Sequence, residues 1–132
     1  MRIHKTLNIS LWFAQGLMAF IFLMAGTMKA TQPIEQLSLS MSWVKDFSTG
    51  MVRFIGLSEI LGAIGLLLPS LLRIKPILTP IAALGLIIVM IAAFVYHILN
   101  AEYALLGVNI FLGAIAGFIV WGRYKQIPIQ EK

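Results

Sequence analysis

The sequence of 132 residues contains no cysteine, and charged side chains make up only 11% of it. Without cysteine, the chain cannot form disulfides, thiolate metal sites or an electron relay through its own thiols. The charged fraction is less than half of the roughly 25% that is typical of soluble domains. So few charges cannot cover a surface that faces water, which excludes an ordinary soluble domain.

Long apolar runs fill the rest of the chain, which is 60% hydrophobic with a mean hydropathy of +0.94. Each run approaches the roughly 20 residues that a helix needs to cross a bilayer. We therefore expect an all-α membrane protein, a bundle of four transmembrane helices in one domain over residues 1–132. The first run is longer than a signal-peptide core and no small-x-small cleavage site follows it, so we expect it to be a span. The expected spans are residues 9–28, 51–72, 77–99 and 103–121.

The segment between the first two spans, residues 31–50, is more polar and too short to cross the bilayer. Pro33 is suited to begin a helix, and Trp43 is suited to anchor it at the interface. The pattern predicts a short amphipathic helix lying on the membrane or capping the bundle; the alternative is an ordered loop. Its apolar side would carry Ile34, Leu37, Met41, Val44 and Phe47, and its polar side Glu35, Ser38, Ser42, Lys45 and Asp46.

The net charge of +5 comes from basic residues scattered between the apolar runs. Because they form no basic stripe, nucleic-acid binding is not expected, and contact with membrane lipids is. Lys and Arg gather on the side of the bundle that holds both termini and the middle turn, which by the positive-inside rule predicts cytoplasmic termini. That side carries Arg2, Lys5, Arg73, Lys75, Arg123, Lys125 and Lys132, whereas the other carries Lys29, Lys45 and Arg53.

A carboxylate, Glu59, lies near the middle of the second span, where a charge costs at least about 2.5 kcal/mol. Asn109 lies at a similar depth on the fourth span, so we expect it to be the hydrogen-bond partner of Glu59. Arg53 lies six residues before Glu59 and points elsewhere around a helix of 3.6 residues per turn. It is therefore expected to meet Glu102 or the lipid headgroups.

Lys29 and His97 are expected to reach the same outer rim from the first and third spans. The candidate polar pocket is thus Lys29, Arg53, Glu59, His97, Glu102 and Asn109, with no catalytic residue and no metal site assigned. The alternatives are that Lys29 and Arg53 snorkel to the headgroups, and that Glu59 is a structural polar group. Gln15 is expected to form a hydrogen bond between helices.

Small residues recur where helices in lipid approach each other closely. Gly62 and Gly65 lie on one side of the second span, and Gly113 and Gly117 form a Gly-x-x-x-Gly pair on the fourth. We expect them to serve packing within the chain, with self-association into a homo-oligomer as the alternative.

Two segments carry a family resemblance: Phe22-Leu-Met-Ala-Gly-Thr-Met-Lys29, and the stretch Arg53–Pro69 with Gly56, Ser58, Glu59, Gly62 and Gly65. With Ala82-Ala-Leu-Gly85 and His97, the chain resembles the DoxX-like family of small four-helix bacterial membrane proteins. The resemblance implies an inner-membrane location and a functional role for Lys29, Arg53, Glu59 and His97. The family is named for a subunit linked to quinol oxidation and thiosulfate–quinone oxidation. Distant eukaryotic relatives resemble membrane chaperones.

Two functions follow as hypotheses. The first is an accessory subunit that binds a hydrophobic small molecule, such as a quinone or a lipid, near Glu59 and works with a respiratory or redox partner. It has no intrinsic cofactor and no expected catalytic activity of its own. The second is a non-catalytic chaperone or assembly factor for other membrane proteins, with residues 31–50 as its contact surface. A transporter has less support, because no repeat of discontinuous helices is visible.

Overall fold

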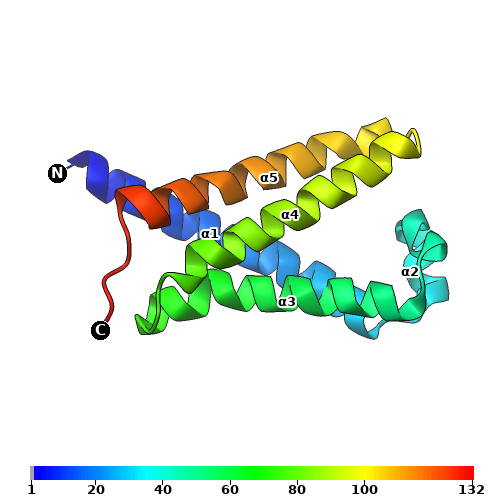
Figure 1. Ribbon diagram of the computed structural model, residues 1–132, viewed down its shortest axis with the longest axis horizontal. Helices are drawn as coiled ribbons and strands as arrows, with labels where there is room; N and C mark the ends of the chain where they lie inside the picture. The colour runs from blue at the N-terminus through cyan, green and yellow to red at the C-terminus, as the bar shows by residue number, and fades with distance from the viewer. Residues whose placement is uncertain (1) are drawn as a thin grey trace.

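Four long helices form the body of the protein in this computed structural model, which describes residues 2–132 (Figure 1). Four helical segments are long and apolar enough to cross a membrane, the fourth running over Tyr103–Gln126, which confirms the expected bundle of four apolar helices. The first helix begins at Arg2, earlier than expected, because its polar first turns continue the helix beyond the apolar run. The helices are α1 (Arg2–Thr31), α3 (Thr49–Leu72), α4 (Leu78–Leu99) and α5 (Leu106–Trp121), with short turns η2 (Tyr103–Leu105) and η3 (Gly122–Gln126) flanking α5.

The two termini lie at the same end of the bundle, together with the turn between α3 and α4 (Figure 1). We call this the terminal end. The opposite end holds the turn between α4 and α5 and the segment between α1 and α3. We call it the α2 end.

At the α2 end, the expected amphipathic helix is divided into α2 (Ile34–Ser40) and a 3-10 helix η1 (Ser42–Asp46). The predicted short helix is therefore present, but it is interrupted at Met41, which has φ −133° and ψ 84°. The predicted apolar side is largely confirmed: Leu37 and Val44 are fully buried, and they form a small core with Val52 of α3. The break allows both pieces to direct an apolar side chain at the start of α3.

Helices α1 and α3 cross in backbone contact at two glycines. A Cβ atom added to Gly26 would lie 2.6 Å from the carbonyl oxygen of Gly56, and one added to Gly56 would lie 2.7 Å from the backbone nitrogen of Ala30. No side chain fits there without separating the helices. This crossing positions the polar side chains of α1 and α3 in the half of the bundle nearer the α2 end.

A second contact region between the helices lies near the terminal end, where Pro69 interrupts the backbone hydrogen bonding of α3. Proline cannot donate to the carbonyl four residues earlier, and the Gly65 carbonyl instead accepts a hydrogen bond of 3.1 Å from Thr79 Oγ1. The next carbonyl, that of Leu66, accepts one of 2.6 Å from Gln15 Nε2. The predicted helix–helix hydrogen bond of Gln15 is thereby confirmed. Polar side chains of neighbouring helices commonly satisfy a proline-interrupted membrane helix in this way.

The small residues behave differently on the two helices where they were noted. An added Cβ would meet the Leu86 side chain at Gly62 and Ala82 Cβ at Gly65, so these positions pack α3 against α4 as predicted. At Gly117 it would meet nothing within 4 Å, and at Gly113 only Met90 Cβ at 3.9 Å. The prediction of close packing within the chain is therefore wrong for the Gly113–Gly117 pair.

Candidate functional site

A cavity of about 510 Å³ lies between the four long helices and η1 in the half of the bundle nearer the α2 end. Its walls are mainly apolar and aromatic, with Trp43, Phe47 and Tyr96 on the side of η1 and the end of α4. Four of the six predicted polar residues line it: Lys29, Glu59, His97 and Asn109. Arg53 and Glu102 lie outside its lining.

The charged centre of the cavity wall is an ion pair between α1 and α3. Lys29 Nζ lies 2.6 Å from Glu59 Oε1, and the side chains are 12% and 1% exposed, respectively. Lys29 also lies over the ring of Trp43, with Nζ 5.6 Å from the ring centroid. The snorkelling interpretation of Lys29 is therefore wrong, because its ammonium group turns inward to neutralise the buried carboxylate.

The helix geometry explains why this pair forms. Lys29 follows Gly26 by three residues and Glu59 follows Gly56 by three residues, so each lies on the face at which the helices cross. Side chains on a helix tilt toward its N-terminus. Because α1 and α3 run in opposite directions, the two side chains tilt toward each other, and the long lysine spans the remaining distance.

Arg53 does not line the cavity, but it binds the backbone at the end of α1 that carries Lys29. Its Nη1 donates hydrogen bonds to the carbonyl oxygens of Lys29, at 2.9 Å, and Gln32, at 2.5 Å. The Lys29 carbonyl belongs to the last turn of α1, where backbone acceptors have no partner within the helix, and Gln32 directly follows that helix. Arg53 therefore does not form the expected contact with Glu102 and, as predicted, does not pair with Glu59; its contact with lipid headgroups stays a prediction.

Asn109 faces the same cavity from α5 but does not form the expected hydrogen bond with Glu59. Its Nδ2 is buried and has no hydrogen-bond partner within residues 2–132. The prediction is wrong, and the partner of the Glu59 carboxylate is instead Lys29 of α1. What remains is a buried amide donor on the cavity wall.

His97 and Glu102 meet at the rim, where the sequence suggested. His97 Nδ1 lies 3.2 Å from Glu102 Oε1, and Ser42 Oγ donates to Glu102 Oε2 at 3.2 Å. The neighbouring Tyr96 hydroxyl donates to Asp46. These contacts hold η1 against the end of α4, so η1 becomes a wall of the cavity.

The aromatic wall was not predicted as part of the site. Trp43 and Phe47 lie edge to face, with ring centroids 5.7 Å apart, and Phe47 lies 5.6 Å from Tyr96. The sequence offered a weak signal: Trp43 and Phe47 lie close together in residues 31–50, and Tyr96 directly precedes His97. In the described chain, residues 2–132, no group of three or more His, Asp and Glu side chains is placed to hold a metal ion.

Four membrane-spanning helices around an apolar cavity with a buried ion pair define a multi-pass membrane protein with an internal polar site. The sequence pattern of the DoxX-like family matches residues 13–119, and the chain belongs to that family. No curated protein and no solved structure matches the chain.

Proposed function

We propose that this protein binds a hydrophobic small molecule of the quinone class in the cavity beside Glu59. The observation that carries the proposal is a mostly apolar cavity of about 510 Å³ whose wall contains an unpartnered buried amide donor, Asn109 Nδ2. Ligand pockets commonly measure about 300–1,000 Å³ and are lined by apolar and aromatic groups with a few polar groups. A buried donor without a partner is costly, and a ligand acceptor would satisfy it.

The polar groups of the wall suit a head group with carbonyl oxygens. A quinone presents acceptors and no donors, and Lys29 Nζ and Asn109 Nδ2 are donors on two different helices. Glu59 holds the ammonium group of Lys29 at the wall through the 2.6 Å contact. The aromatic side chains Trp43, Phe47 and Tyr96 would pack against the ring.

We further propose that the protein works as an accessory subunit of a redox partner in the bacterial inner membrane. The chain has no cysteine, so we assign electron transfer to the partner. The concentration of Lys and Arg at the terminal end supports cytoplasmic termini.

The direct test is to purify the protein from its native membrane in mild detergent and measure quinone in an organic extract. Roughly one quinone per chain is expected. Ala93→Phe would fill the cavity without changing charge and should remove the quinone, whereas Ala104→Leu, outside the cavity lining, should retain it.

A second pair of variants tests the polar wall. Glu59→Gln should lower the bound quinone, because Lys29 loses the group that holds it, whereas Glu102→Gln changes a carboxylate outside the cavity lining and should not. If extracts of wild type contain no quinone, or if Ala93→Phe and Ala104→Leu retain equal amounts, the proposal is wrong.

An assembly factor is the second candidate function, favoured by one observation. Leu39 on α2 is 87% exposed, and it lies outside the four spans. A photo-crosslinker at position 39 should capture a distinct membrane protein if this surface docks one, whereas crosslinks to lipid alone would count against this function.

A further inference from the structure

At the terminal end, Arg123 is buried among neutral groups. The residue is only 3% exposed. Nε donates to Gln15 Oε1 at 2.6 Å, and Nη1 donates to Asn8 Oδ1 at 2.8 Å and to the Ile127 carbonyl at 3.2 Å. The guanidinium carbon lies 5.1 Å from the centroid of the Trp12 ring. These contacts orient the guanidinium group, but none of them carries a negative charge.

The charge of Arg123 has no counter-ion among residues 2–132, where Glu59 pairs with Lys29 and Glu102 contacts His97. Its Nη2 is buried and has no hydrogen-bond partner in the same part of the chain. A buried charge without a partner of opposite sign is strongly unfavourable. The described residues therefore leave both the charge of Arg123 and its Nη2 group without a partner.

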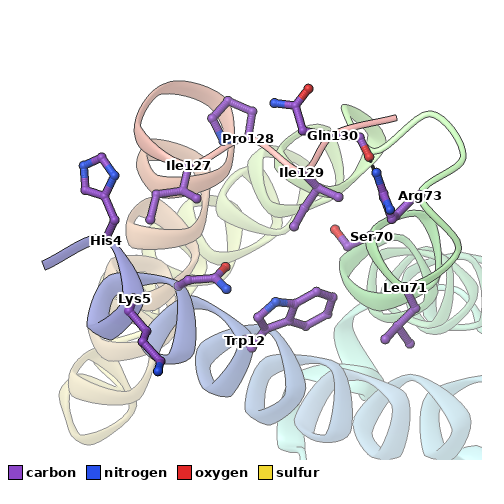
Figure 2. A pocket seen from close by; sticks show the side chains of 11 residues that line it. His4, Lys5, Trp12, Ser70, Leu71, Arg73, Ile127, Pro128, Ile129 and Gln130 are labelled. Carbon is purple, nitrogen blue, oxygen red and sulfur yellow. Dashed lines mark hydrogen bonds between the residues drawn. The ribbon is translucent and has the colours of Figure 1, made fainter. Parts of the chain in front are cut away.

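Two cavities at this end of the bundle share lining residues of the C-terminal segment. Figure 2 shows the larger, about 590 Å³, with Trp12 on one side and Ile127, Pro128 and Ile129 opposite it. The smaller, about 250 Å³, is lined by Arg123 itself, with Lys75 and Tyr124. Pro128 and Ile129 line both.

The charge around the two cavities is predominantly positive. Lys5 and Arg73 line the larger cavity, and Lys75 and Arg123 line the smaller. One carboxylate, Glu131, lines the smaller cavity. The Arg73 Nε donates to the Gln130 carbonyl at 2.9 Å, which holds the C-terminal segment against the end of α3 (Figure 2).

We propose that the terminal end binds the phosphate group of an anionic phospholipid, with the phosphate in the smaller cavity between Lys75 and Arg123. The cavity lies where the membrane spans end, at the level of lipid headgroups, and basic pockets between membrane helices suit such headgroups. Guanidinium groups bind phosphate oxygens through paired N–H donors, and the buried Nη2 of Arg123 has no hydrogen-bond partner among residues 2–132. The acyl chains would lie along the bundle.

The test follows the unfolding temperature of the purified protein in an uncharged detergent during titration with phosphatidylglycerol, phosphatidylcholine or inorganic phosphate. Phosphatidylglycerol should raise the unfolding temperature with saturation, and phosphatidylcholine should not. Removal of one positive charge by Lys75→Gln should weaken phosphatidylglycerol binding about fivefold.

Two control variants separate a site from general charge. Glu131→Gln removes the negative charge of the smaller cavity and should strengthen binding about fivefold. Lys45→Gln makes the same change as Lys75→Gln on an exposed lysine at the α2 end and should leave binding within twofold of wild type. A variant that merely folds poorly cannot produce the opposite shifts expected for Lys75→Gln and Glu131→Gln.

Equal stabilisation by phosphatidylcholine and phosphatidylglycerol would overturn the proposal, as would equal weakening by Lys45→Gln and Lys75→Gln. If inorganic phosphate binds with the same dependence on the variants and phosphatidylglycerol binds no more tightly, the phospholipid is overturned as the ligand. Phosphate-dependent stabilisation that is much weaker than that by phosphatidylglycerol supports the lipid.

Discussion

The two ends of the bundle each bury a cation, but they treat its charge in different ways. At the α2 end, Lys29 lies against a carboxylate, Glu59, and the pair is neutral. At the terminal end, Arg123 lies against the neutral oxygens of Gln15, Asn8 and Ile127. A low-dielectric interior penalises the second arrangement more than the first. The buried charges therefore balance at the α2 end, whereas at the terminal end the charge of Arg123 is not balanced by any described residue.

The cavities beside the two cations differ accordingly. The cavity at the α2 end is mostly apolar and presents donors on two helices, Lys29 and Asn109, to a neutral ligand with acceptor atoms. The cavities at the terminal end collect unpaired positive charge. The two halves of the bundle therefore differ in the chemistry that their cavities present, mainly apolar at the α2 end and predominantly positive at the terminal end.

The largest effect should come from breaking the neutral pair. Lys29→Met leaves Glu59, at 1% exposure, without a counter-charge, and should lower the free energy of unfolding by about 3–5 kcal/mol. Titration with a denaturing detergent would measure it. The double variant with Glu59→Leu should recover most of the loss, because it removes both charges. A loss below about 1 kcal/mol for Lys29→Met would contradict a buried, paired carboxylate.

The matched change at the terminal end should cost less. Arg123→Met removes donors from the buried Gln15 Oε1 and from Asn8 Oδ1, which costs up to about 3 kcal/mol, but it also removes an unpaired buried charge, so the net loss should be smaller. The same titration measures it, and Asn8→Ala, which removes one of these acceptors, should cost a smaller part. A loss larger than that of Lys29→Met would show that Arg123 has a stronger partner than these neutral groups.

The next test uses glycines, since each half of the bundle contains a glycine in close contact with a neighbouring helix. An alanine at Gly56 would push against the backbone of α1 and should destabilise the protein by about 2 kcal/mol. Gly122→Ala meets the flexible end of the Leu11 side chain, which can rotate away, so its cost should be smaller. Gly117→Ala, with no atom within 4 Å, is the neutral control. Equal losses at all three positions would rule out the backbone crossing as the cause.

The smallest effects should come from the exposed hydrogen bonds that close each end, Ser42 to Glu102 and Arg73 to Gln130. Ser42→Ala and Arg73→Gln should each change the free energy of unfolding by less than about 1 kcal/mol. Hydrogen exchange would locate the effects, with faster exchange in η1 for the first and in the C-terminal segment for the second. A global change in exchange would contradict a local role.

Much of the fold was predictable because the signals are local. The spans follow from run length and hydropathy, and the apolar side of the segment between α1 and α3 follows from residue spacing. The break at Met41 was missed, because periodicity continues across it while burial of Leu37 and Val44 against Val52 depends on α3. The long start of α1 was missed because hydropathy marks the membrane core and not the end of the helix.

Within the candidate site, residue types were predictable and partnerships were not. Glu59 signals a polar centre wherever it lies in an apolar run, and Gln15 signals a helix–helix hydrogen bond. Matching depths alone pointed to Asn109 as the partner of Glu59, because that estimate ignored the direction and reach of side chains. The burial of Arg123 gave no local signal, since a basic residue at the end of a span is usually exposed.

By itself, the sequence determined that the chain crosses the membrane as four helices and carries a costly carboxylate within the second span, because hydropathy and length are properties of each segment alone. Only the tertiary structure decided which cation neutralises that carboxylate. The crossing at Gly26 and Gly56 brings α1 and α3 together in opposite directions, so that Lys29 and Glu59 tilt toward each other. The same packing, at the far end of α1, leaves Arg123 with neutral partners.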